Sequence, residues 1–197
     1  MAFNEFEQDS SKLFLTAVNI LLQTIGEVPI ETEQEIDDIL EASIAASILV
    51  ETKKEVLADD WEFNRDKEFT MPIDYSGHIA IPVNVLDISS RDGDLIMRDW
   101  KLYSKKKQSA IFDKEQIVDI VWDLPFNSLT HPIRNYITTR AARKFQARQI
   151  MDANVYGFTE KDEMAARVIA RRSDDRIQPN DIYTSPYGAA YLVDGTL

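Results

Sequence analysis

The histidines and the acidic residues are the side chains of this sequence whose types could support catalysis or bind a metal. His78 and His131 stand far apart, without an HxxxH pair and without an accompanying G-x-S-x-G segment. The chain contains no cysteine, which excludes thiolate metal sites, cysteine nucleophiles and disulfide bonds. A zinc site would need both histidines together with distant carboxylates. We therefore expect neither a metal ion nor a cofactor.

Paired carboxylates are the other route to chemistry, because glycoside hydrolysis uses two of them. Adjacent acids occur at Asp37-Asp38, Asp59-Asp60 and Asp174-Asp175. Neighbouring residues of a helix do not face each other, and nothing marks any of these pairs as lying in a cleft. Glycine motifs that cradle phosphate are also missing. We therefore predict that the protein is not an enzyme, and a polysaccharide hydrolase is the alternative.

The net charge of −12 comes entirely from the first third of the chain. Residues 1–62 hold fifteen acidic and three basic residues, whereas residues 63–197 hold nineteen of each. Such a chain repels phosphate, so a DNA-binding accessory protein is only the third possibility. No apolar run approaches the roughly 20 residues that cross a bilayer, and the N-terminus has no signal-peptide core. We expect no membrane contact and a protein made and used in a cytosol-like space.

The clearest pattern is a basic amphipathic helix expected over residues 130–152. Arg140, Lys144 and Arg148 recur every four residues and form a cationic stripe. An apolar stripe lies roughly 100° away around the helix. Such a helix has one face in a core and one charged face that needs an acidic partner. The acidic helix expected over residues 32–58 is the natural candidate, in the same chain or in a neighbouring subunit.

The elements that must position this helix follow from periodicity and capping. Helical spacing with Ser, Thr and Gly at the ends predicts helices over residues 11–25, 32–58, 130–152 and 159–175. Near-alternation and turn signals such as Asp92-Gly93 predict a strand from Trp61 and further strands over residues 78–83, 85–88, 95–97, 101–103 and 117–122. The predicted class is α+β, a bundle of about four helices with an inserted small antiparallel sheet or sandwich. The expected domains are a helical bundle of residues 1–60 and 124–175, a β subdomain of residues 61–123 and an irregular C-terminal tail of residues 176–197.

The C-terminal tail contains three tyrosines, Tyr183, Tyr187 and Tyr191, spaced by four residues around Pro186. The proline disfavours a helix there. Aromatic side chains in such a tail suit docking to a partner, with plain disorder as the alternative. We predict that these tyrosines and the cationic stripe contribute to a subunit interface.

Three stretches together carry a family resemblance. The first is AVNILLQTIGEVPI (residues 17–30), a helix that ends in an IGE-x-P-[IV] link, and the second is the W-x-F-N stretch at residues 61–64. The third is LPFNSLTHPIRNYITTRAARKFQAR (residues 124–148), a proline-led turn followed by an Ile-x-[ST]-[KR]-A-x-[KR]-x-F-x-x-R helix. In their order and spacing these stretches resemble tail tubular protein A, the adaptor of the short tails of T7-like bacteriophages. The tail after Asp175 departs from this pattern.

The resemblance implies a structural virion protein without catalysis, located in the virion tail and assembled in the host cytoplasm. Such proteins form a dodecameric ring between the portal protein and the tail nozzle (tail tubular protein B), with tail fibres near that junction. The genome would pass through the lumen without sequence-specific binding. The acidic charge agrees with such a lumen, and the loose tail agrees with a free protein that is monomeric before assembly.

Overall fold

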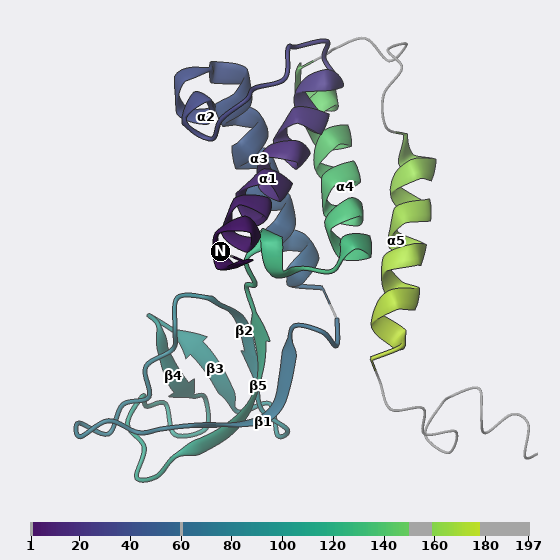
Figure 1. Ribbon diagram of the computed structural model, residues 1–197. Coiled ribbons are helices and arrows are strands. Elements are labelled where there is room, and N and C mark those ends of the chain that lie inside the picture. Colours follow the sequence, from purple (N-terminus) through teal and green to yellow (C-terminus); the bar gives the residue numbers. More distant parts are fainter. Residues whose placement is uncertain (1, 60, 150–158, 178–197) are drawn as a thin grey trace, which may run out of the picture.

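Figure 1 shows the computed structural model of the protein, which describes residues 2–59, 61–149 and 159–177 of the chain. Within these ranges, side chains are described from Lys12 onward. Helices lie at both ends of the described chain and strands lie between them, which confirms the predicted α+β class. The elements are α1 (Ala2–Gln23), α2 (Gln34–Asp38), α3 (Leu40–Leu57), β1 (Arg65–Met71), β2 (Val85–Ser89), β3 (Leu95–Arg98), β4 (Lys101–Ser104), β5 (Gln116–Trp122), a 3-10 turn (Phe126–Ser128), α4 (His131–Gln149) and α5 (Glu160–Asp175).

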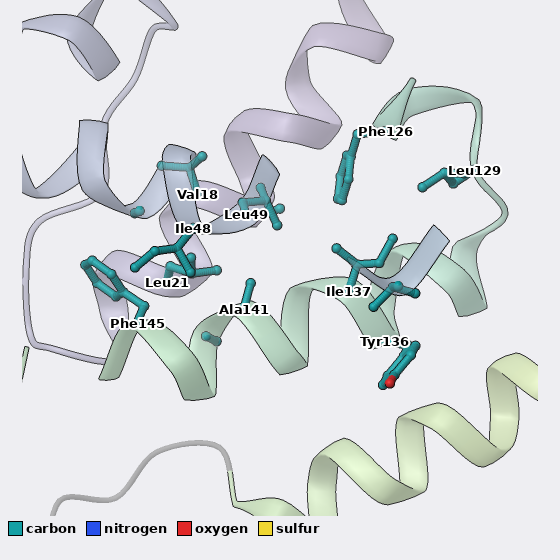
Figure 2. Close-up of a cluster of buried hydrophobic side chains, with 14 of the residues drawn as sticks. Val18, Leu21, Ile48, Leu49, Phe126, Leu129, Tyr136, Ile137, Ala141 and Phe145 are labelled. Atoms are coloured by element: carbon teal, nitrogen blue, oxygen red, sulfur yellow. The ribbon is translucent and has the colours of Figure 1, made fainter. Parts of the chain in front are cut away.

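The helices pack around one hydrophobic core. Helices α3 and α4 pack against each other and against α1, whereas α2 packs on α3 and α5 lies on the outer side of α4 (Figure 1). Figure 2 shows side chains from α1, α3 and α4 meeting in this core, among them Leu21, Leu49, Ile137 and Phe145. All four are fully buried. Burial of each such side chain stabilises the fold by about 1.5 to 3 kcal/mol, so this core holds the helices together.

The strands form two small antiparallel sheets. Strand β5 lies between β1 and β2 in a three-stranded sheet, and β3 pairs with β4 in a separate hairpin. A second hydrophobic core, which includes the fully buried Ile79, Leu102 and Ile120, lies among these strands and their loops. The division of the chain into a bundle domain and a β subdomain stays a prediction.

Two chain segments cross between the helical part and the sheets, and polar contacts join them. The side-chain amide of Asn64 donates to the carbonyl oxygens of Leu57 at 2.8 Å and Trp122 at 2.9 Å. The backbone N–H of Trp122 donates back to the carbonyl oxygen of Asn64 at 2.8 Å. Lys53 of α3 forms an ion pair with Asp123, directly after β5, at 2.6 Å. The end of α3, the start of β1 and the end of β5 are therefore held together.

Helix α1 begins earlier than predicted and ends close to the predicted position. It spans Ala2–Gln23, against an expectation of residues 11–25. Gly26 has a φ of 81°, a left-handed conformation that glycine adopts without a steric penalty. The N–H of Glu27 donates to the carbonyl oxygen of Leu22 at 3.1 Å, the hydrogen bond of a Schellman motif. Gly26 therefore closes this helix, as predicted.

The single helix predicted over residues 32–58 is wrong, because the chain breaks at Ile39. Ile39 has φ −112° and ψ 119°, an extended conformation that separates α2 from α3. Asp37 and Asp38 end α2, where the helix dipole disfavours anions and where Asp is a poor helix former. The break places Glu41 in the first turn of α3, where the dipole favours a negative charge.

The strand predicted from Trp61 is also wrong in its start. Strand β1 begins at Arg65, and the Trp61 side chain is buried in the core of the helices. Its Nε1 donates to the carbonyl oxygen of Val56 at 2.6 Å, and its ring centroid lies 6.2 Å from that of Tyr136. A large aromatic side chain gains more from this burial than from a place in a strand.

The later strands β2, β3, β4 and β5 occur close to their predicted positions. Residues 78–83, by contrast, form no strand. Ala80 makes an isolated bridge to Lys101 of β4, while Ile79 reaches the second core. The pairing is too short for a ladder, although burial alternates as in a strand, with Ile79 and Ile81 buried and Ala80 exposed.

Asp-Gly pairs are typical of two-residue hairpins, but the Asp92-Gly93 turn forms no hairpin. It joins β2 to β3, which belong to different sheets. The tight hairpin joins β3 to β4 through Asp99 and Trp100, whose φ angles are 49° and 57°. Two central residues with positive φ are the pattern of a type I′ turn, which usually contains Asn-Gly, Asp-Gly or Gly-Gly. Asp99 fits the first position, but Trp100 stands where glycine is usual, so the sequence carries only part of the signal for this turn.

Helix α5 begins at the predicted cap. Thr159 accepts a hydrogen bond from the N–H of Asp162, and the Asp162 carboxylate accepts from the N–H of Thr159, which completes a capping box. Near the other end of the helix, the buried carboxylate of Asp174 accepts hydrogen bonds from the N–H groups of Glu62 at 2.9 Å and Phe63 at 3.0 Å. Asp174 therefore fixes α5 to the segment that links α3 to β1.

We predict that Asp174→Ala lowers the free energy of unfolding by about 2 to 3 kcal/mol, because two partly buried N–H groups lose a charged acceptor. Urea unfolding measures this value. The exposed neighbour Asp175 provides a matched control. Asp175→Ala is the same substitution at a side chain in solvent, so it should change the free energy of unfolding by less than about 0.5 kcal/mol. Equal effects of the two variants would contradict a clamp at Asp174.

Candidate functional site

Helix α4 carries the predicted cationic stripe and is positioned by its apolar face. Pro132 lies in its first turn, where the missing N–H leaves no helix hydrogen bond unmade. Tyr136, Ile137 and Phe145 are buried in the core. Figure 2 shows Ile137 and Phe145 on the side of α4 towards α1 and α3, and Tyr136 on the side towards α5. This anchoring leaves the basic residues of α4 at the margins of the core, within reach of the neighbouring helices.

The predicted cationic stripe is paired with carboxylates of α3. Arg140 Nη2 lies 3.5 Å from Glu55 Oε2, and Lys144 donates a hydrogen bond to the same oxygen. Arg148 Nη1 lies 3.5 Å from Glu51 Oε2. The acidic partner that the sequence requires is therefore found within the same chain, on the helix that was the natural candidate. A role of this stripe between subunits stays a prediction.

Two basic residues of α4 also contact α5. Arg143 donates from Nε to Glu163, and Arg140 Nη1 lies 3.5 Å from the other carboxylate oxygen of Glu163. Arg140 thus bridges carboxylates on both sides, Glu55 of α3 and Glu163 of α5. The three helices are joined by one continuous set of ion pairs.

A second set of contacts links α5 to the end of α3, and sequence reasoning missed it. Asp59 Oδ2 accepts from Arg167 at 3.1 Å and from Arg171 at 2.7 Å. The guanidinium carbon of Arg171 lies 3.7 Å from the centre of the Trp61 ring, a cation–π geometry. The spacing of the two arginines, one helical turn apart, is the only local signal that could have indicated a shared partner.

The carboxyl groups of the described residues give no support to the hydrolase alternative. A glycosidase needs a carboxyl group whose pKa is raised, so that it can act as a general acid. In six carboxyl groups of the described residues the pKa is clearly lowered, in each case first by a hydrogen bond from another side chain. These groups are Glu35, Glu55, Asp74, Asp92, Asp94 and Asp162. The hydrolase alternative stays an untested prediction.

The acidic turn at Asp92-Gly93-Asp94 resembles a fragment of a calcium loop. The positive charge that pairs with it comes from a lysine side chain. Lys106 Nζ lies 2.6 Å from Asp92 Oδ2, and the Lys106 N–H donates to Asp94 at 2.7 Å. The hydrogen bond from Lys106 is the main reason that the pKa of Asp92 falls to about 2. The turn and the lysine loop opposite it are therefore joined by this pair.

Several expectations concern features that the described residues either lack or do not include. Within residues 2–59, 61–149 and 159–177, no group of three or more histidine or acidic side chains has the arrangement of a metal site. No helix in the same ranges combines the length and the apolar character of a membrane span. Tyr183, Tyr187 and Tyr191 lie outside the described residues, so their predicted interface role stays untested.

The fold and its site define a structural scaffold, in which a buried core positions helix α4 and ion pairs join α4 to its neighbours. The family model for tail tubular proteins matches residues 15–179, and the chain belongs to this family. It is therefore a structural protein of the phage virion tail, where it assembles with other virion proteins. A search of curated proteins gave no match.

We predict a weak coupling between Glu55 and Lys144, about 0.3 to 1 kcal/mol in a double-mutant cycle of Glu55→Gln and Lys144→Met, because both side chains are partly exposed to water. Thermal or urea unfolding measures it at low salt, and about 1 M NaCl should reduce it. The pKa of Glu55 is lowered from 4.5 chiefly by the hydrogen bond from Lys144. The coupling is therefore present above pH 4.5 and is lost as the pH falls through the lowered pKa of Glu55. A coupling unchanged by salt and pH would contradict this assignment.

We predict that Lys106→Met raises the pKa of Asp92 from about 2 towards its ordinary value of 3.8, because the largest cause of its depression is removed. The pKa stays somewhat below 3.8, since Ser90 and the Asp94 N–H still donate to this carboxylate. NMR titration of the Asp92 carboxyl carbon measures the shift. Lys107→Met is the control, because Lys107 pairs with Asp113 instead and its loss should leave the Asp92 titration unchanged.

Proposed function

We propose that the protein is a tail adaptor of the tail tubular protein A type, a ring of twelve copies that joins the portal protein to the tail nozzle and encloses part of the DNA ejection channel. The observation that carries this proposal is the convergence of the three stretches that resemble tail tubular protein A. Residues 17–30, 61–64 and 124–148 contribute to one hydrophobic core, although more than 100 residues separate the first stretch from the helix of the third.

Specific contacts hold each stretch in this core. In the first stretch, the Asn19 side chain both accepts from the N–H of Ile30 and donates to its carbonyl oxygen, each at 2.9 Å. In the second, the ring of Trp61 packs near that of Tyr136 from the third. The first and third stretches are also in contact, because α1 packs directly against α4. The residues that carry the resemblance therefore form the structural centre of the helical part.

The charge distribution supports a channel through which DNA slides. No lysine or arginine occurs between Lys12 and Lys53, whereas eight acidic residues do. The exposed members of this group include Glu27, Glu31 and Glu33, which precede α2. A wall of such residues repels phosphate and disfavours attachment of DNA during ejection.

The proposed partners follow from the adaptor role. They are further copies of the chain, the portal protein, the nozzle protein (tail tubular protein B) and tail fibres near their junction, with a monomeric free protein before assembly. The protein acts in this role without catalysis.

Electron microscopy of particles assembled with and without this chain tests the proposal. Complete particles should contain a twelve-fold ring of the chain directly on the portal. Particles that lack the chain should carry neither this ring nor the nozzle, because the nozzle would have no attachment site. Particles that lack the chain but retain an adaptor ring on the portal would contradict the proposal, and would indicate a more distal position in the tail.

A further inference from the structure

Helix α5 exposes an apolar face that no described residue covers. Met164, Val168 and Ile169 are exposed by 65%, 49% and 55% of their surface. At 100° per residue they lie within an arc of about 140° of the helix surface, which excludes the buried Ala166 and Ala170. Single exposed apolar residues are normal, but three that adjoin on one helix face indicate an interaction surface. We call residues 161, 164, 165, 168, 169, 172 and 176 the outer face of α5.

The ends of this outer face are basic. Lys161 lies before the apolar residues, and Arg172 and Arg176 lie after them on the same side of the helix. All three are exposed, and the exposed Asp175 on the same side leaves the face with a net charge of +2. The helix therefore presents apolar side chains flanked by positive charge, the arrangement of a docking surface for an acidic and partly apolar protein face.

A face with the complementary properties lies on α2 and the start of α3. Leu40 is 68% exposed and its neighbour Ile39 is 38% exposed. They are surrounded in sequence by acids, of which Asp37 and Asp38 are exposed and Glu41 is half-buried. We call residues 37–41 the acidic face.

The two faces lie on opposite sides of the helical part. Figure 1 shows α2 at one side, α1, α3 and α4 in the middle, and α5 at the other side. Helix α5 packs on α4, and α2 packs on α3. One copy therefore cannot bring its own two faces together, but two copies placed side by side can. A contact between different faces of identical subunits repeats from copy to copy and can close into a ring.

We propose that the outer face of α5 packs on the acidic face of the next copy of this chain. This inference rests on the proposed ring, and it names the surfaces that join its subunits. A second copy fits better than DNA, because phosphate would pair with Lys161, Arg172 and Arg176 but would leave Met164, Val168 and Ile169 exposed to water. In the acidic face, the apolar residues can cover the apolar residues of the outer face of α5, and the acidic residues can pair with its basic residues.

Cysteine cross-linking in assembled tails tests the proposal, and the chain is suited to it because it contains no natural cysteine. A chain with both Leu40→Cys and Val168→Cys should form disulfide-linked ladders of dimers, trimers and larger species when tails are oxidised. Disulfide formation requires Cβ atoms about 3.5 to 4.5 Å apart, so the ladder reports close contact of the two faces. Each single-cysteine chain should form no ladder.

A matched control pairs Leu40→Cys with Ile117→Cys, since Ile117 of β5 is similarly exposed but lies outside both faces. An equally strong ladder in this control would overturn the proposal. Dimers from Val168→Cys alone would overturn it too, because they indicate a symmetric contact between two α5 helices. Tails that contain the double-cysteine chain but yield no ladder would overturn the interface and leave the adaptor role intact. Tails that never contain the natural chain would contradict the adaptor role itself.

Charge reversal supplies an independent measurement that does not depend on disulfide geometry. Arg172→Glu with Arg176→Glu, and separately Asp37→Arg with Asp38→Arg, should each lower incorporation into tails by about tenfold or more, because like charges then face each other. An equimolar mixture of the two variants should restore incorporation, since every contact in an alternating ring again joins opposite charges. No recovery in the mixture, with both variants folded by circular dichroism, would overturn the proposal.

Discussion

The position of helix α4 is the constraint on which the helical part depends. Its apolar face is fully buried at Ile137, Ala141 and Phe145, and α1 and α3 pack against it. The basic residues beside that face then reach Glu51 and Glu55 of α3 and Glu163 of α5. Burial of one large apolar side chain contributes about 1.5 to 3 kcal/mol, whereas a partly exposed ion pair contributes about 0 to 1 kcal/mol. Packing therefore sets where α4 lies, and the ion pairs adjust how its neighbours are aligned to it.

Helix α5 is attached in a different way from the other long helices. The apolar side chains that it buries are small, Ala166 and Ala170, and so they contribute little hydrophobic free energy. Its position depends more on polar contacts: the Asp174 clamp, the Asp59 pairs with two arginines, and Glu163 on α4. Its larger apolar residues face outward instead. In a protein of the virion tail, a helix that is fixed by polar contacts and exposes apolar residues has the properties of a surface that becomes buried on assembly.

Sequence reasoning succeeded where the signal is local. The capping residues at Thr159, the closing glycine at Gly26 and the amphipathic pattern of α4 act within one or two helical turns, and all three have the predicted structure. It failed where distant residues decide the outcome. Trp61 leaves the expected strand because α3 and α4 provide a buried site for its ring.

The candidate site shows the same division. The pairing of the α4 stripe with acidic α3 could be expected from charge alone, because few other acidic helices are available. The contacts of Asp59 and Asp174 could not, because their partners are more than 100 residues away in the sequence. The break at Ile39 and the turn at Asp99-Trp100 were missed for a further reason: neither contains the proline or glycine that usually marks such a change of direction.

The junction at Asn64 has a mechanical consequence for a protein that works inside a tail. Each of the two crossing segments is a single chain, which alone would allow the sheets to swivel against the helices. Asn64 and Trp122 each donate a hydrogen bond to the other, and Lys53 pairs with Asp123. The two crossing segments are therefore bonded to each other and to α3. A twisting load on the sheets is then shared by two segments and delivered to the end of α3, close to the core. These contacts therefore oppose rotation of the sheets against the helices.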